Sequence, residues 1–114
     1  MKSGIYLITN TVNGKHYVGR SIGIGGRREI HITRLRGGRH ENRHLQAAWN
    51  KYGEVAFTHT VVEYCEADTR AELEALLLRR EDWWMELLDS RNPAKGYNKR
   101  TAERCLHAEE TKVK

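Results

Sequence analysis

Arg27, His31 and Glu81 are the side chains whose types and positions first suggest chemistry on a phosphate group. Arg27 and His31 are four residues apart in a predicted helix, so they lie on one face of it. A guanidinium forks onto phosphate oxygens, and an imidazole donates or relays a proton. Glu81 has the carboxylate that Mg²⁺ prefers, and Mg²⁺ often takes only one or two ligands from a protein. Taken alone, Arg27 and His31 would more often be solvated, and Glu81 would more often belong to a surface ion pair.

Two other histidines, His40 and His44, have the i,i+4 spacing of two zinc ligands on a helix. No third ligand stands near them in the sequence, so zinc is a weak alternative. We interpret His40 instead as a contact to phosphate or to a leaving group.

Two β-prone runs, residues 5–8 and 16–18, open the chain. They flank Asn13-Gly14, a pair that supplies the positive φ angles of a tight hairpin turn. Residues 4–6 read Gly-Ile-Tyr and residues 17–19 read Tyr-Val-Gly. The pattern therefore predicts that Tyr6 and Tyr17 lie side by side on paired strands.

The remaining candidates should be positioned by helices and one further strand. We expect a helix over residues 24–35 that breaks at 37–38, a second helix that ends at Gly53, and a strand over residues 57–64. A Thr69-x-x-Glu72 capping box opens a long helix that persists to about residue 88. Glu81 falls at the border of the apolar stripe of that helix. Arg80 falls within the stripe, which requires snorkelling or a buried ion pair.

The two triplets and the order of the later polar residues resemble the GIY-YIG nuclease family. Val18 stands where the family usually carries Ile. Members place an Arg and a His on the first helix, another His after it, a Glu on a later helix and an Asn near the end of the module. The matching residues here are Arg27, His31, His40, Glu81 and Asn98. The resemblance covers residues 2–98 and looks closest to the catalytic domains of phage intron-encoded homing endonucleases.

This resemblance implies a metal-dependent DNA endonuclease whose catalytic set is Tyr6, Tyr17, Arg27, His31, His40, Glu81 and Asn98. In that family, Glu81 would hold Mg²⁺ or Mn²⁺, Arg27 would stabilise negative charge and Tyr6 would activate water. Because free tyrosine has a pKa near 10, we expect cationic neighbours such as Arg27 to lower the pKa of Tyr6. The sequence leaves open which of Tyr6, Tyr17 and His31 takes the proton. Asn98 is expected to orient phosphate or a neighbouring side chain.

The charge of the chain is concentrated in its first half. The formal net charge is +5, and residues 1–53 carry 10 Lys and Arg against 2 Asp and Glu, whereas residues 54–114 carry 10 against 13. A basic face of this kind is typical of a nucleic-acid binder, although a solvated basic surface would look the same. The predicted DNA or phosphate contacts are Arg27, Arg28, Arg34, Arg39, His40 and Arg43.

Length and composition predict one small domain. The 114 residues suggest an α+β fold, with a small antiparallel sheet of about three strands flanked by helices. Residues 1–98 would form the nuclease-like domain and residues 99–114 a polar tail. Cys65 and Cys105 lack CxxC spacing, which argues against a disulfide framework. With no charged-then-apolar leader and no apolar run near ~18 residues, we expect a cytoplasmic protein, phage- or mobile-element-encoded, that makes no membrane contact.

Two other functions stay open from the sequence. The chain could be a DNA-binding module that does not cut, or a structure-selective repair or processing nuclease like the excision-repair incision subunit that also carries a GIY-YIG domain. The sequence contains no recognisable helix-turn-helix or zinc finger, so we expect weak intrinsic sequence specificity. An additional DNA-binding domain, a partner protein or the structure of the DNA would then supply the specificity. The sequence does not predict the oligomeric state.

Overall fold

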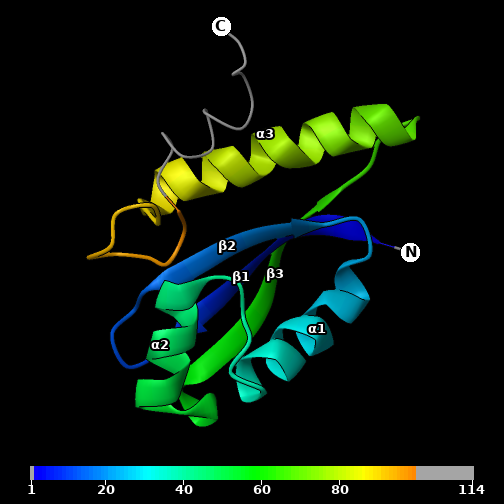
Figure 1. Cartoon of the computed structure of the whole chain (residues 1–114). Coiled ribbons are helices and arrows are strands. Elements are labelled where there is room, and N and C mark those ends of the chain that lie inside the picture. The colour runs from blue at the N-terminus through cyan, green and yellow to red at the C-terminus, as the bar shows by residue number, and fades with distance from the viewer. Residues whose placement is uncertain (1, 100–114) are drawn as a thin grey trace, which may run out of the picture.

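The computed structural model describes residues 2–99 and shows a three-stranded antiparallel sheet with helices on both faces (Figure 1). Its strands, in the order β2-β1-β3, are β1 (Ser3–Asn10), β2 (His16–Ser21) and β3 (Phe57–Cys65). The helices are α1 (Ile24–Arg36), α2 (Arg43–Tyr52) and α3 (Arg70–Leu88), and a short 3₁₀ turn, η1 (Glu54–Ala56), precedes β3. The predicted α+β class is confirmed. Residues 100–114 of the predicted tail, Cys105 included, lie outside the described residues.

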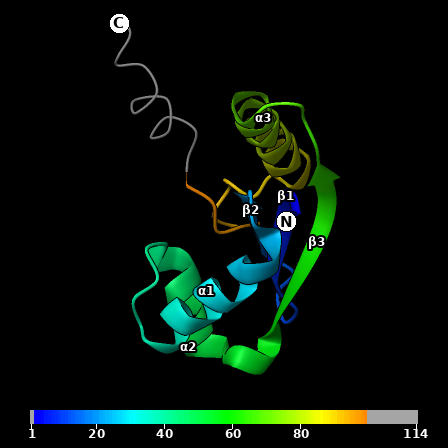
Figure 2. The same ribbon diagram turned by 90° about the vertical axis from the view of Figure 1, so that its right-hand side faces the viewer.

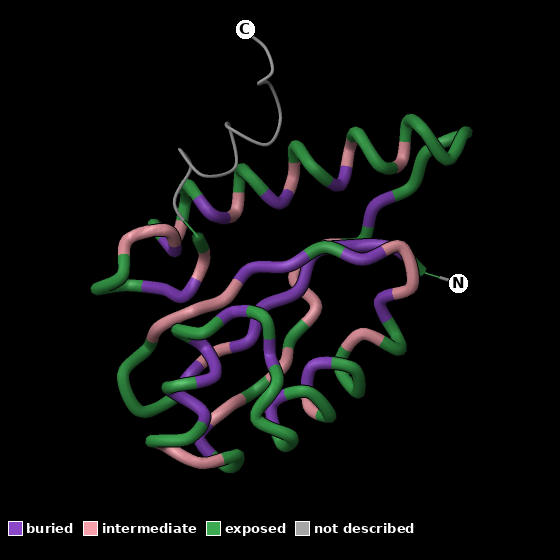
Figure 3. Tube along the Cα trace, in the orientation of Figure 1, coloured by how far each residue is buried: buried purple, intermediate pink, exposed green. Residues whose placement is uncertain are grey.

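The central strand β1 contributes to two separate cores because successive strand side chains point to opposite faces of a sheet. Ile5 and Leu7 pack under α3, while Tyr6 and Ile8 face α1 and α2. Figure 2 shows the sheet between α3 on one side and the α1–α2 pair on the other. In Figure 3, β1 is almost entirely buried, whereas the outer faces of the helices are exposed.

The β1–β2 hairpin is confirmed, but its turn is not the predicted tight one. Residues 11–15 separate the strands, and the amide of Gly14 donates to the carbonyl of Asn10 at 2.7 Å. Gly14 has φ 78°, whereas Asp89 is the single non-glycine among the described residues with a positive φ. Asn13 therefore does not adopt the left-handed conformation that a two-residue Asn-Gly turn requires. Its side-chain oxygen instead accepts from the amide of Lys15 at 3.0 Å.

Local hydrogen bonds explain where the helices start. The Asn42 side chain accepts from the Leu45 amide and opens α2, and the Thr69 hydroxyl accepts from the Glu72 amide and opens α3. The helix bounds agree with the predicted ones to within one residue, whereas β1 and β2 extend up to three residues beyond the predicted runs.

Arg80, which the sequence placed within the apolar stripe of α3, is half-buried in an ion pair. Its guanidinium donates to both oxygens of Glu63 on β3 at 2.9 and 3.0 Å, and the Trp84 indole donates to the same carboxylate. The ion-pair explanation of Arg80 is therefore confirmed. Within residues 2–99, no helix is both long and apolar enough to cross a membrane.

Candidate active site

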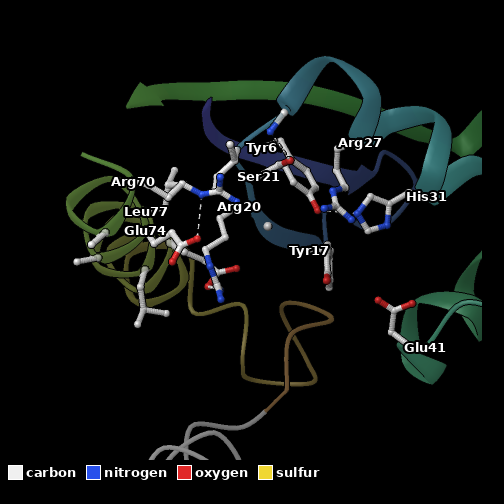
Figure 4. A pocket seen from close by; sticks show the side chains of 17 residues that line it. Tyr6, Tyr17, Arg20, Ser21, Arg27, His31, Glu41, Arg70, Glu74 and Leu77 are labelled. Carbon is white, nitrogen blue, oxygen red and sulfur yellow. Dashed lines mark hydrogen bonds and ion pairs between the residues drawn. The ribbon is translucent and has the colours of Figure 1, made fainter. Parts of the chain in front are cut away.

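A pocket of about 960 Å³ opens along β2, one of the two edge strands, between α1 and α3 (Figure 4). Its walls bring together five of the seven catalytic candidates, namely Tyr6, Tyr17, Arg27, His31 and Glu81. The first four are supplied by the sheet and α1, and Glu81 by α3. The pocket thus lies where the two helical layers meet beyond the edge of the sheet.

Both triplet glycines are required because other atoms approach them closely. Tyr6 is paired with Gly19 across the hairpin, and a Cβ on Gly19 would lie 2.2 Å from Cζ of Tyr6 and 2.3 Å from its hydroxyl oxygen. A Cβ on Gly4 would lie 2.2 Å from the backbone carbonyl oxygen of Glu63 on β3. The glycine of the second triplet therefore makes room for the tyrosine of the first.

The two tyrosines share a face of the sheet but are not directly opposite each other. Tyr6 pairs with Gly19 and Tyr17 pairs with Ile8, so the rings are offset diagonally by two residues. Burial is the main cause that raises the pKa of both groups, that of Tyr17 to about 12. Arg27 acts in the opposite direction on both, but burial outweighs it. Arg27 therefore acts in the expected direction, but burial leaves the net pKa of Tyr6 raised in the free protein.

A line of hydrogen bonds runs from the Tyr6 hydroxyl into the protein through two histidines. The hydroxyl oxygen lies 2.5 Å from Nε2 of His31, and Nδ1 of His31 lies 2.7 Å from Nε2 of His40. Nδ1 of His40 accepts from the backbone N–H of Asn42 at 3.0 Å. Burial, together with the nearby His40, lowers the pKa of His31 to about 3, and burial also lowers the pKa of His40.

His40 is 3% exposed, so it reaches the site through its neighbours His31 and Tyr17, and it meets the Tyr17 ring edge-on. Its ring stacks on that of His31, with centroids 4.9 Å apart. His44 instead packs edge-on against Tyr97, and the described residues contain no group of three His, Cys, Asp or Glu that could hold a metal. The zinc alternative therefore finds no support in the described part of the chain.

His59 and Asn42 also take part in the site, and the sequence reasoning did not identify them. His59, on β3, stacks on the Tyr6 ring with centroids 4.9 Å apart and an interplanar angle of 14°. Its Nε2 atom is buried and has no hydrogen-bond partner among the described residues. The alternation in residues 57–64 predicted the strand, but the β1–β3 register, which contains a bulge, places His59 beside Tyr6.

Arg27 presents an unsatisfied donor in the pocket wall. Its Nε atom is buried without a hydrogen-bond partner in the described structure. A buried donor left unpaired costs on the order of 1–3 kcal/mol, so an exception of this kind requires an explanation. A phosphate oxygen would satisfy it once the Arg27 side chain turns that N–H towards the pocket, because guanidinium groups bind phosphate through two parallel N–H donors.

Glu81 is 6% exposed, more deeply buried than its predicted position at the border of the stripe suggested. Nη1 of Arg20, on β2, donates to Oε1 of Glu81 at 2.5 Å, and the Arg20 side chain is 44% exposed. Arg20 thus covers the carboxylate and neutralises it. A site that already accommodates a positive charge on one buried carboxylate suits Mg²⁺ or Mn²⁺, which would take its other ligands from phosphate and water.

Asn98 acts on the backbone of β2. Its side-chain oxygen accepts from the Val18 amide at 2.9 Å, its side-chain nitrogen donates to the Val18 carbonyl at 2.9 Å, and the Ser90 hydroxyl donates to the same Asn98 oxygen at 2.7 Å. The amide therefore pairs with the open edge of β2 as a neighbouring strand would. In this conformation Asn98 orients the strand that carries Tyr17, and it does not line the pocket.

The predicted phosphate-binding arginines occupy several different environments. Arg28 and Arg34 are exposed and form ion pairs with Glu29 and Glu41 at 3.4 and 3.0 Å. Arg39 is exposed in the loop before α2, Arg43 is exposed in the first turn of α2, and His40 is buried. Of the six predicted phosphate contacts, Arg27 alone lines the pocket.

Comparison with known proteins agrees with this geometry. The protein-family model of the GIY-YIG catalytic domain matches residues 2–98 of this chain. The chain is 37% identical over 98 residues to Intron-associated endonuclease 1 of Enterobacteria phage T4. The matched region covers 86% of this chain but 37% of that protein, so the chain spans little more than a third of that relative. The catalytic domain of homing endonuclease I-TevI superposes with a TM-score of 0.76 at 33% identity, and the match covers 87% of this chain and 99% of that one. A point mutant of the catalytic domain of intron endonuclease I-TevI superposes with a TM-score of 0.74 at 36% identity, and the match covers 86% of this chain and 93% of that one. The chain belongs to the GIY-YIG family.

Proposed function

We propose that this protein is a divalent-metal-dependent endonuclease that hydrolyses phosphodiester bonds in DNA. One observation carries the proposal: a guanidinium, a tyrosine bonded to a histidine and a buried carboxylate line one open pocket. Hydrolysis of a phosphodiester needs a base for water, positive charge for the transition state and stabilisation of the leaving oxygen. The phage relative named above is an endonuclease, which supports the same reaction class.

Each pocket residue has a specific role in this proposal. Arg27, which lines the pocket, binds a non-bridging phosphate oxygen through its guanidinium and stabilises the charge that develops there. Glu81 would hold Mg²⁺ or Mn²⁺, and a bound ion of this kind polarises the phosphoryl oxygen as a Lewis acid. Tyr6 orients the attacking water through its hydroxyl oxygen and accepts the proton of that water. Because burial raises the pKa of Tyr6, the free protein holds a neutral phenol, and Tyr6 becomes a base only in the DNA complex.

The test is cleavage of supercoiled plasmid with Mg²⁺ and with EDTA. Wild-type protein should cut the plasmid in Mg²⁺ but not in EDTA. Glu81→Gln should bind DNA but not cut it in either condition. Glu74→Gln is the matched control, because Glu74 lies on the same helix and lines the same pocket but is exposed and paired with Arg70 at 3.0 Å. Cleavage by Glu81→Gln at the wild-type rate, or cleavage in EDTA, would refute the metal assignment. DNA binding without cleavage by wild type would favour a non-cleaving module.

Tyr6→Phe tests the proposed base. A lost general base costs about 10² to 10⁴ in rate, so single-turnover cleavage should fall by that factor while the fold is retained. A rate within a few-fold of wild type would leave Tyr6 as a packing residue. Flapped and branched duplexes in the same assay would identify a structure-selective repair nuclease, if they were cut much faster than linear DNA.

We also propose that specificity comes from another DNA-binding domain or a partner protein. Phosphate contacts give affinity without sequence information. With about four to six cationic side chains engaged, the log–log salt dependence of binding should have a slope of roughly −4 to −5. A competition titration among unrelated duplexes at several salt concentrations measures both quantities. One strongly preferred sequence, or a binding constant that salt does not change, would contradict this part of the proposal.

A further inference from the structure

Hydrogen bonds link Asn42, His40, His31 and Tyr6 in series. Their directions follow from one fixed donor, the backbone N–H of Asn42. The Asn42 backbone N–H can only donate, and it points at Nδ1 of His40 at 3.0 Å. That nitrogen therefore carries no proton. A neutral imidazole must carry one proton, so the proton of His40 is on Nε2.

The same reasoning fixes the proton of His31. Nε2 of His40 lies 2.7 Å from Nδ1 of His31 and donates to it, because it carries the proton. Nδ1 of His31 must then be the acceptor, and the single proton of neutral His31 is on Nε2. That atom lies 2.5 Å from the Tyr6 hydroxyl oxygen and donates to it. Because the Tyr6 oxygen accepts this bond, the hydroxyl's own proton points away from His31.

We propose that His40, held by the Asn42 backbone, is a positioning residue that fixes His31 as a hydrogen-bond donor to Tyr6. His31 then does not remove the phenol proton. Instead it stabilises the negative charge that Tyr6 gains when its hydroxyl proton passes to a solvent water molecule in the pocket. This inference rests on the proposed function for its catalytic meaning, but the tautomers it assigns do not depend on cleavage.

The surroundings favour the neutral histidine forms that the inference requires. Both rings are 3% exposed, and His40 is clamped further because its own backbone N–H donates to Gln46 at 3.0 Å. The titratable and charged groups around His31 are Tyr6, Tyr17, Arg27, His40, His59 and Glu41. Of these, Arg27, His40 and His59 act against a positive charge on His31, and Glu41 alone favours it.

The direct test is ¹⁵N NMR of the histidine side chains at neutral pH, without DNA or metal, since the ring-nitrogen shifts separate the two neutral tautomers. Wild-type His31 and His40 should both be protonated on Nε2. His40→Leu should introduce a measurable share of the Nδ1-protonated form of His31. His40→Gln keeps an N–H donor of similar reach and should restore the Nε2-protonated form. His44→Gln, in the first turn of α2 and outside the hydrogen-bonded line, should leave the His31 signals unchanged.

Cleavage then connects the tautomer with rate. Single-turnover cleavage by His40→Leu should fall about 10²-fold, the loss typical of a misplaced catalytic group, and His40→Gln should recover most of it. Nδ1-protonated His31 in wild type, or His31 signals and cleavage unchanged in His40→Leu, would overturn the inference. If wild-type protein showed the assigned tautomers but cut no DNA, the hydrogen-bond assignment would stand and the proposed function would fail.

Discussion

Replacing Gly19 by Ala tests whether the site depends on the close approach of Tyr6 to the β2 backbone. A Cβ at this position would lie 2.2 Å from Cζ of Tyr6, 2.3 Å from its hydroxyl oxygen and 2.7 Å from Cε1. These contacts are far inside the 3.5–4.0 Å optimum for carbon atoms. The ring must therefore move by more than 1 Å, and it cannot do so without lengthening the 2.5 Å contact to Nε2 of His31.

The geometry allows the effects of Gly19→Ala on stability and on cleavage rate to be estimated. Tyr6 is 3% exposed and lies between Gly19 and the His59 ring, so little free space is available for the displaced ring. Overpacking a tight core costs about 1–3 kcal/mol, and we expect Gly19→Ala to lose that much free energy of unfolding. A displacement of about 1 Å in a catalytic group costs on the order of 10²-fold in rate, so cleavage should fall at least that far.

Urea unfolding and single-turnover plasmid cleavage measure the two effects. Gly25→Ala is the control, because a Cβ there meets nothing within 4 Å and Gly25 lies inside helix α1. This change should leave cleavage intact and stabilise the fold slightly, since Ala is the better helix former. In a Tyr6→Ala background the clash is absent, and Gly19→Ala should then add little destabilisation. Wild-type stability and rate in Gly19→Ala would refute the steric reasoning.

Three further predictions concern the groups around the pocket. Arg20→Gln leaves the buried Glu81 without its guanidinium partner, so the metal-free protein should lose stability and Mg²⁺ should raise its urea midpoint more than that of wild type; an equal Mg²⁺ effect would contradict this. Asn98→Ala removes both hydrogen bonds to Val18, each worth about 0.5–1.5 kcal/mol, so its urea midpoint should fall below that of wild type. An unchanged midpoint would show that the β2 edge does not need the amide. The folded-state pKa of His31 is about 3, below the ordinary 6.5, so the folded protein binds fewer protons than the unfolded one and stability should fall as the pH drops from about 6.5 towards 3. His31 contributes at most about 1.4 kcal/mol per pH unit, and an equally steep fall in His31→Gln would assign the effect to other groups.

The local structure was predictable because its signals are short-range. Two β-prone runs and the Asn-Gly pair between them identified the hairpin, and Thr69 and Glu72 identified the start of α3. The sequence also identified Arg27 and His31 as neighbours on one helical face, since i,i+4 spacing needs no tertiary information. The turn type failed because Asn13 satisfies its side chain with the Lys15 amide and leaves the positive φ to Gly14.

Tertiary placement set the features that the sequence could not give. His59 meets Tyr6 through the β1–β3 register, and the Asn42 amide meets His40 through the conformation of the loop before α2. The shift in the pKa of Tyr6 also had the opposite sign to the expected one. Charges near Tyr6 could be counted in the sequence, but the burial that outweighs them is set by packing.

The topology explains why the pocket lies at β2. Neither helical layer holds a complete set of groups for phosphodiester chemistry, because Arg27 and His31 belong to the α1 layer and Glu81 to α3 on the opposite face. The sheet separates the two layers, and groups from both meet beyond its β2 edge. An edge strand would ordinarily leave unpaired backbone groups, and Asn98 satisfies both of those at Val18 without adding another strand. A fourth strand at this edge would stabilise the sheet but would fill the space through which the two layers reach the same phosphate.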